Sequence, residues 1–180
     1  KINVHAIHKA NVLRLTDGIF LDACRKISKD YPKIQYKEML VDAATAHIVR
    51  NPDQFDVIIT TNMFGDILSD LTSELSGSLG LSGSLNVGNG IPMAQAQHGA
   101  AIDIMNKGIA NPISLILSVS MLLDWLGFSK RIDLYNKANK MIVKVVEDVL
   151  EESKYMTPDL GGNANTLKLT DEILKKIEKA

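Results

Sequence analysis

The spacing of apolar positions alternates between strand-like and helix-like patterns over the first half of the chain. Short β-rich runs and segments of helical spacing follow one another in the order 2–8, 17–29, 36–41, 43–50, 55–61 and 67–79. The run at 55–61, FDVIITT, is apolar on both faces, which is typical of a central strand in a parallel sheet. The segment 17–29 places apolar residues on one side of a helix, at Ile19, Phe20, Ala23 and Ile27. This order predicts an α/β fold with a parallel or mixed sheet and helices packed on it.

The second half of the chain has a different character. Residues 76–90 are rich in glycine and serine, which indicates either a crossing between domains or a set of tight turns. Beyond them, 112–126 fits an apolar helix and 130–153 a long amphipathic helix. A last helix begins near Thr166 or Thr170.

Composition narrows the possible partners. The formal net charge is −1, from 20 basic and 21 acidic residues, so nucleic acid is not an expected partner. The apolar stretch 108–123 is shorter than the roughly 20 residues that span a membrane, and we expect no membrane segment. The single cysteine, Cys24, cannot form an intrachain disulfide, which fits the cytoplasm or an organelle matrix.

Two carboxylates follow the apolar run at 55–61. Asp66 and Asp70 are four residues apart, so on a helix they share one face. Ligands bind at the carboxyl ends of parallel strands, and paired carboxylates there suit a hard cation such as Mg²⁺ or Mn²⁺. The alternative is an ordinary first helical turn, in which aspartate favours the helix dipole.

Polar residues also follow the other two predicted strands. Lys9 and Asn11 come after the first strand, and Asp42 comes after the second. A lysine in that place could relay a proton if burial or a nearby metal lowered its pKa. The alternatives are a surface lysine in a loop and, for Asp42, a helix N-cap.

A fourth candidate is the stretch 98–103, HGAAID. Small residues after His98 let backbone N–H groups approach a phosphate or ribose. Asp103 could accept hydrogen bonds from ribose hydroxyls and would repel a 2′-phosphate. The sequence has no GxGxxG fingerprint, and the alternative is a tight turn with a satisfied histidine.

Taken in order, these segments resemble the β-decarboxylating dehydrogenases, which include isocitrate, 3-isopropylmalate, homoisocitrate and tartrate dehydrogenases. The matching stretches are HKANVLRLTDGIFLDAC at 8–24, VDAATAHIVRNPDQFDVIITTNMFGDILSD at 41–70, HGAAIDIMNKGIANP at 98–112 and TPDLGG at 157–162. The resemblance covers the C-terminal half of such an enzyme and implies part of the isopropylmalate dehydrogenase-like fold. Residues 1–79 would then belong to the smaller, dimer-forming domain and 80–180 to the larger domain.

The resemblance also implies roles for the strand-end residues. Lys9 would be the proton-relay lysine and, with Asp42, would be catalytic. Asp42, Asp66 and Asp70 would hold Mg²⁺ or Mn²⁺. In the family, the lysine and the first aspartate reach the site of the neighbouring protomer, so a homodimer is expected.

The cofactor implied by the resemblance is NAD. Asn11 would lie near the nicotinamide. The adenosine side would be lined by His98, Gly99, Ala100, Ala101, Asp103 and Asn111. The residue pair Asp103 followed by Ile104 resembles the pattern of NAD-preferring members.

The implied reaction is oxidative decarboxylation of a small 2-hydroxy acid such as isocitrate or 3-isopropylmalate. The family's substrate-binding arginine cluster lies upstream of these motifs, so we expect the 180-residue chain to be inactive alone. The alternative is a non-catalytic regulatory or assembly subunit of a hetero-oligomeric isocitrate dehydrogenase. The expected location is the cytoplasm, or the mitochondrial matrix in a eukaryote.

Overall fold

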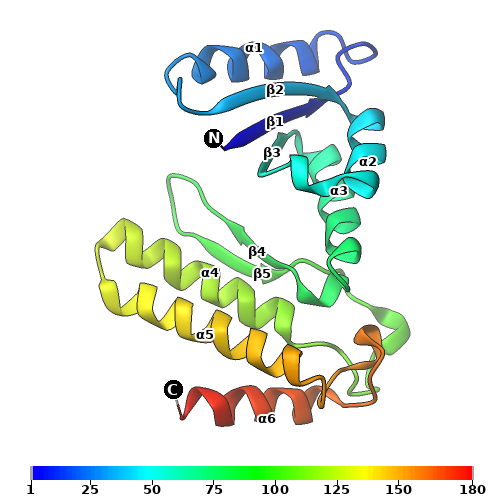
Figure 1. Ribbon diagram of the computed structural model, residues 1–180, viewed down its shortest axis with the longest axis vertical. Helices are drawn as coiled ribbons and strands as arrows, with labels where there is room; N and C mark the ends of the chain where they lie inside the picture. Colours follow the sequence, from blue (N-terminus) through cyan, green and yellow to red (C-terminus); the bar gives the residue numbers. More distant parts are fainter. Residues whose placement is uncertain (1, 180) are drawn as a thin grey trace. The chain divides into compact units, whose positions relative to one another are not determined.

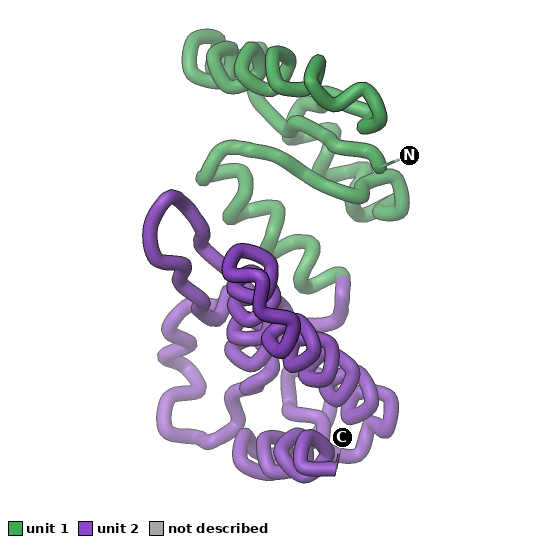
Figure 2. Tube along the Cα trace, turned by 90° about the vertical axis from the view of Figure 1, so that its left-hand side faces the viewer, with its two compact units in different colours: residues 1–75 green, residues 76–180 purple. Residues whose placement is uncertain are grey.

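The structure is a computed structural model that describes residues 2–179. The chain divides into two compact units between Leu75 and Ser76, and each is described by itself below (Figure 2). The division falls at the start of the glycine- and serine-rich segment, whereas the family resemblance implied a boundary after residue 79.

The first unit is a parallel three-stranded sheet covered by helices (Figure 1). The strand order is β2-β1-β3, and β1 pairs in parallel with both neighbours. Its elements are β1 (Asn3–His8), α1 (Thr16–Ser28), β2 (Gln35–Leu40), α2 (Val41–Arg50), β3 (Val57–Thr60) and α3 (Asn62–Leu75). Each strand is followed by a helix, as the alternating pattern predicted.

The core of this unit lies between the sheet and α2 and α3. Ile7 of β1 is fully buried and forms one apolar cluster with Ala44, Ile48 and Leu68. Because successive strand residues point to opposite faces, the neighbouring Ala6 is buried on the other side, which α1 covers.

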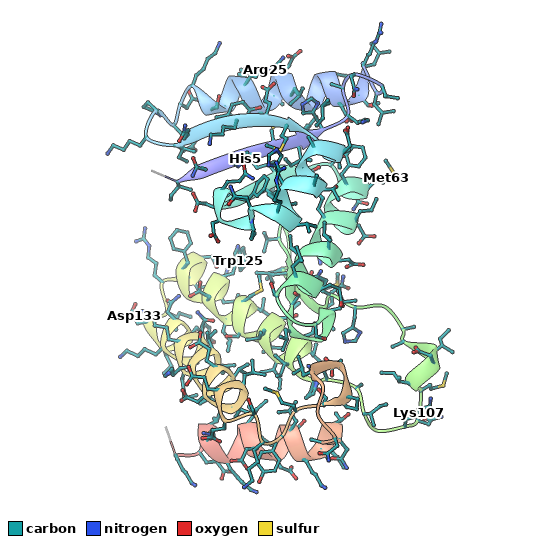
Figure 3. The ribbon with its side chains drawn as sticks, turned by 45° about the vertical axis from the view of Figure 1, so that its right-hand side comes forward. His5, Arg25, Met63, Lys107, Trp125 and Asp133 are labelled. Carbon is teal, nitrogen blue, oxygen red and sulfur yellow. The ribbon has the colours of Figure 1, made fainter. Side chains whose placement is uncertain are left out.

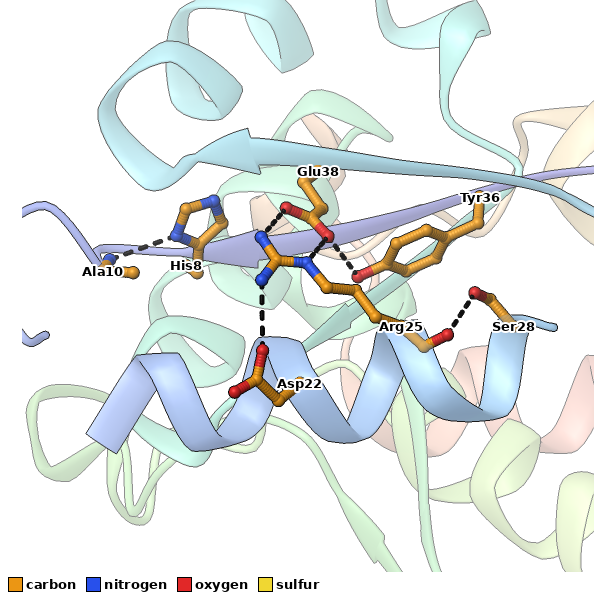
Figure 4. Close-up of polar contacts among 7 residues, drawn as sticks. All are labelled: His8, Ala10, Asp22, Arg25, Ser28, Tyr36 and Glu38. Atoms are coloured by element: carbon orange, nitrogen blue, oxygen red, sulfur yellow. Dashed lines mark hydrogen bonds and ion pairs between the residues drawn. The ribbon is translucent and has the colours of Figure 1, made fainter. Parts of the chain in front are cut away.

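A bidentate ion pair ties α1 to β2 (Figure 4). The Arg25 guanidinium donates from Nε and Nη2 to the two carboxylate oxygens of Glu38, each at 2.7 Å. Tyr36 donates its hydroxyl to the same carboxylate at 3.1 Å. The contact with Arg25 lowers the pKa of Glu38 and fixes the helix against the strand.

The apolar side of α1 is not its buried side. The buried residues of α1 are Asp17 and Leu21, whereas Ile19 is 73% exposed and Ile27 58% exposed. In the described sheet β3 is an edge strand rather than a central one, and Ile59 is 41% exposed.

The second unit packs an antiparallel hairpin on α4, with α5 packed on α4 and α6 on α5 (Figure 1). Its elements are β4 (Gly83–Asn86), β5 (Met93–Ala96), α4 (Ile113–Lys130), α5 (Asp133–Glu152) and α6 (Thr166–Ile177). The core is an apolar cluster from α4, α5 and α6, made of Ile113, Val145, Val146, Val149, Leu169 and Ile173.

The boundary between α4 and α5 differs from the prediction. Arg131 has φ 56° in the left-handed region, which ends α4 after Lys130 and delays α5 until Asp133. Helix α4 is therefore 18 residues long, and by length and composition alone it could cross a membrane. It packs on β4, β5 and α5, and core helices of folded domains pass the same test.

Candidate functional site

The carboxyl ends of β1 and β2 bring two predicted site residues together. The parallel register pairs His8 with Leu40, so the residues that follow both strands meet at one edge of the sheet. There the Lys9 Nζ donates to Asp42 Oδ1 at 2.5 Å. The hydrogen bond from the lysine holds the pKa of the Asp42 carboxyl below its usual range. The two side chains differ in exposure, at 26% for Lys9 and 65% for Asp42.

A buried aspartate holds the backbone of the lysine. Asp17, in the first turn of α1, is 2% exposed, and its Oδ2 accepts from the Lys9 main-chain N–H at 2.6 Å. The Lys9 carbonyl in turn accepts from the N–H groups of Val12 and Leu13, which closes the loop that carries the exposed Asn11. Sequence reasoning missed Asp17, because an acidic residue in a first turn has an ordinary explanation in the helix dipole.

Asp66 and Asp70 lie on the predicted helix, α3. Helix α3 begins at Asn62, five residues before the predicted start, so its first turn contains no acidic residue. The first-turn explanation for Asp66 therefore does not apply. The two carboxylates lie one turn apart along the helix, as their spacing predicts.

The predicted metal ligands do not meet within one chain. Among residues 2–179, no group of three or more histidine, cysteine, aspartate or glutamate side chains is arranged to hold a metal ion. Asp42 is paired with Lys9 instead. The residue types fit a hard cation, but within one copy of the chain Asp42 does not join Asp66 and Asp70 in one group. The metal site stays a prediction that requires a second chain.

The predicted nucleotide loop lies in the second unit, directly after β5. His98 Nδ1 is 2.9 Å from the Gly99 carbonyl oxygen, and Asp103 sits in a short 3₁₀ turn at Ile102–Ile104. Ala101 has φ 44°, a left-handed conformation that non-glycine residues adopt at some cost. A Cβ at Gly99 would meet nothing within 4 Å, and Ala100 and Asp103 are exposed. The loop surface is therefore open to a ligand. It continues into the turn marked by Lys107 in Figure 3.

Asn111 is engaged inside the chain. Its side chain is buried, the Nδ2 donates to Asp159 Oδ2 at 2.9 Å, and the Oδ1 accepts from the Ile113 N–H at 3.0 Å. Ser78 donates to the same Asp159 oxygen at 2.6 Å. Burial alone would raise the pKa of Asp159. The hydrogen bonds that its carboxylate accepts lower the pKa by more than burial raises it, so the net shift is downward. The Asn111 side chain is thus used inside the fold, where it fixes the start of α4.

Comparison with known proteins identifies the family. The family model described as isocitrate/isopropylmalate dehydrogenase matches residues 1–177. The chain is 47% identical over 174 residues to 3-isopropylmalate dehydrogenase of Sulfurisphaera tokodaii, covering 97% of this chain and 51% of the relative. It is 43% identical to a regulatory subunit of the mitochondrial NAD isocitrate dehydrogenase of Dictyostelium discoideum, covering 98% of this chain and 48% of that protein.

The fold agrees with this match. The solved isocitrate dehydrogenase from Methylococcus capsulatus superposes with a TM-score of 0.91 at 38% identity, covering 98% of this chain and 51% of that one. The chain spans about half the length of the curated relatives it matches. Both the resemblance and the α/β fold are confirmed, and the chain belongs to the isocitrate/isopropylmalate dehydrogenase family.

Proposed function

We propose that the protein that contains this chain oxidatively decarboxylates a 2-hydroxy acid of the isocitrate or 3-isopropylmalate type, with NAD and Mg²⁺ or Mn²⁺. The observation that carries the proposal is the Lys9–Asp42 pair, 2.5 Å apart where β1 and β2 end. A lysine held by a carboxylate at this edge can supply the proton that replaces CO₂ on the substrate carbon.

Each residue has a distinct part in this proposal. Lys9 holds a proton at Nζ, kept in place by Asp42, and delivers it to the substrate carbon after CO₂ has left. Asp42, Asp66 and Asp70 would hold the divalent ion, which when bound polarises the substrate hydroxyl and offsets negative charge. Asp17 keeps the Lys9 backbone in position.

The surface of α3 supports a homodimer as the active form. Met63 and Ile67 form an apolar stripe one turn long on the helix, and each is 58% exposed. Met63 is labelled on α3 in Figure 3. A stripe of this kind is typical of a surface that a partner covers. Asp66 immediately precedes Ile67, so a second copy on this stripe would approach the carboxylates with its own polar residues.

The loop at 98–103 supports NAD as the cofactor. Its backbone is open on the side of Gly99, and the exposed Asp103 carboxylate can accept from the two ribose hydroxyls. The same negative charge would repel the 2′-phosphate of NADP. We therefore propose that NAD is preferred, with the adenosine half at this loop.

A protomer-mixing experiment tests the shared site. Lys9→Ala and Asp66→Asn proteins of natural length are each assayed with Mn²⁺, NAD and both candidate acids, then unfolded and refolded together in equal amounts. If the two residues come from different protomers, half of the dimers contain one intact site, and activity recovers to about a quarter of wild type. Mixing Lys9→Ala with Asp42→Asn is the matched control and recovers nothing, because both residues come from the same protomer.

Three outcomes would contradict the proposal. No recovery in the Lys9–Asp66 mixture, with mixed dimers demonstrated, refutes the shared site. Wild-type protein that releases no CO₂ from either acid refutes the reaction. Equal turnover with NADP refutes the cofactor assignment.

A second candidate is a non-catalytic regulatory subunit, which is favoured by the 43% identity to a relative of that description. The presence of Lys9, Asp42, Asp66 and Asp70 favours catalysis over this alternative. Calorimetry separates the two. Tight NAD binding with no effect of Mn²⁺ and no turnover indicates the regulatory role.

A further inference from the structure

Two buried serines on α4 hold both strands of the β4–β5 hairpin. Ser114 and Ser118 lie one helical turn apart, and both are fully buried. Ser118 Oγ lies 2.6 Å from the Gln95 carbonyl oxygen of β5 and accepts from the Ser84 N–H of β4 at 2.9 Å. One hydroxyl therefore bridges the two strands.

Ser114 makes the corresponding bridge at the end of the hairpin. Its Oγ donates to the Ser82 carbonyl at 2.5 Å and accepts from the Gln97 N–H at 3.1 Å. The last pair of the strand ladder is Gly83 with Ala96, so Ser82 and Gln97 are the next residues on each side. The Ser114 hydroxyl therefore links the two chains one residue beyond the last strand pair. Gln97 is the residue immediately before His98, where the predicted loop begins.

The hairpin depends on this support because two isolated strands are marginally stable. The helix approaches β4 closely enough for short hydroxyls to reach it. A Cβ built at Gly83 would lie 3.1 Å from both the Leu117 carbonyl carbon and the Ser118 nitrogen. Close approach and short side chains together place the hydroxyls between the strands.

We propose that Ser114 is a positioning residue for the loop at 98–103, fixing the point where β5 ends and the loop begins. The inference rests on the proposed binding of NAD at this loop. The far end of the segment is held separately, since Thr166 donates to the carbonyls of Gly108 and Ala110 at 2.8 and 2.6 Å. Between these anchors, the predicted ligand-facing residues Gly99, Ala100, Ala101 and Asp103 are exposed. Their position therefore depends on the anchors at either end.

Ser114→Ala tests the proposal against Ser120→Ala. Ser120 is also fully buried on α4, but its hydroxyl donates to Asn139 Oδ1 of α5 at 2.6 Å rather than to the hairpin. Both variants, in the protein of natural length, lose buried hydrogen bonding and are expected to lose similar thermal stability. Binding of ADP-ribose, which carries the adenosine half of NAD, is measured by calorimetry.

Ser114→Ala is expected to weaken ADP-ribose binding and to raise the KM for NAD by about tenfold, with the KM for the hydroxy acid unchanged. Ser120→Ala is expected to keep wild-type affinity. If Ser114→Ala does not fold, Ser114→Cys replaces it, because a thiol is a weak donor and acceptor. Equal ADP-ribose affinity in the Ser114 variant and wild type overturns the proposal.

Failure of the proposed function has a different signature. If wild-type protein does not bind ADP-ribose or NAD, the cofactor assignment fails, and amide hydrogen exchange then tests the anchor itself. Faster exchange at the Gln97 and His98 amides in Ser114→Ala, but not in Ser120→Ala, supports the anchor. Unchanged exchange in both variants overturns it.

Discussion

Asp17 holds Lys9 by its backbone, with the carboxylate Oδ2 at 2.6 Å from the lysine main-chain nitrogen. Asp42 holds the same residue by its other end, the ammonium group. The lysine is thus fixed at both ends, once by a buried carboxylate and once by an exposed one. A proton donor in a restrained position loses less entropy when it reaches its transition-state geometry.

Replacement of Asp17 by alanine is expected to lower both stability and turnover. The Lys9 N–H would lose a charged acceptor, which costs about 1.5–3 kcal/mol of unfolding free energy. We expect a large fall in kcat and little change in the KM for NAD, because the displaced group is the proton donor. Urea unfolding and steady-state kinetics on the full-length protein check this. Asp17→Asn, which keeps an acceptor oxygen, is the control, and a kcat for Asp17→Ala equal to wild type would count against the role.

Gly80→Ala is expected to disturb the support of Asn111. A Cβ at Gly80 would lie 2.8 Å from Asp159 Oδ2 and 2.9 Å from the Asn111 Cβ, so the Asn111–Asp159 hydrogen bond must shift. We expect a loss of about 1–3 kcal/mol of unfolding free energy. At Gly88 a Cβ would meet nothing within 4 Å, and Gly88→Ala is the matched control. Equal denaturation midpoints for the two variants would contradict this prediction.

His5 is expected to make the protein less stable in mild acid. Its side chain is 1% exposed and packs on the Phe55 ring with centroids 4.6 Å apart. Burial and the charge of Lys37 lower the pKa of His5 from 6.5, although Asp56 opposes the shift. The unfolded chain therefore binds a proton that the folded chain excludes, so this contribution is complete above pH 6.5 and declines as the pH falls below it.

Unfolding free energies measured at pH values on both sides of 6.5 check the sign. The contribution of one histidine to the slope cannot exceed about 1.4 kcal/mol per pH unit. His5→Gln removes the titrating group and is expected to flatten the profile by part of that slope. Identical slopes for the variant and wild type would show that His5 titrates normally.

Ile67→Lys is expected to dissociate the proposed homodimer. Ile67 is 58% exposed on α3, and a lysine there would place a charge in the surface that a second copy covers. We expect the dissociation constant of the dimer to rise at least about tenfold over wild type, as measured by analytical ultracentrifugation. Ile19→Lys is the control, because Ile19 is 73% exposed on α1, and it should leave the dimer intact.

Activity provides a second readout for the same variant. If the cation site is shared between copies, the monomeric Ile67→Lys protein loses turnover while it keeps its affinity for ADP-ribose. A fully active monomer would refute both the dimer and the shared site.

The local pattern of the sequence was enough for the order of elements in the first unit and for the family, but it did not predict the β4–β5 hairpin, which lies in and just after the glycine- and serine-rich segment. Alternating runs of apolar residues located β1, β2 and β3 within a few residues, because strand and helix periods differ and each period depends on neighbouring positions. The sequence also located the candidate polar residues. Motifs such as HGAAID and DILSD are contiguous, so they can be read without knowledge of the fold.

Tertiary structure decided which groups meet. The Lys9–Asp42 contact joins residues 33 positions apart, and it exists because the parallel register aligns His8 with Leu40. The buried side of α1 and the structural use of the Asn111 side chain likewise depend on what each element packs against. Spacing along one chain does not contain such contacts, because burial and pairing are properties of elements that are distant in sequence.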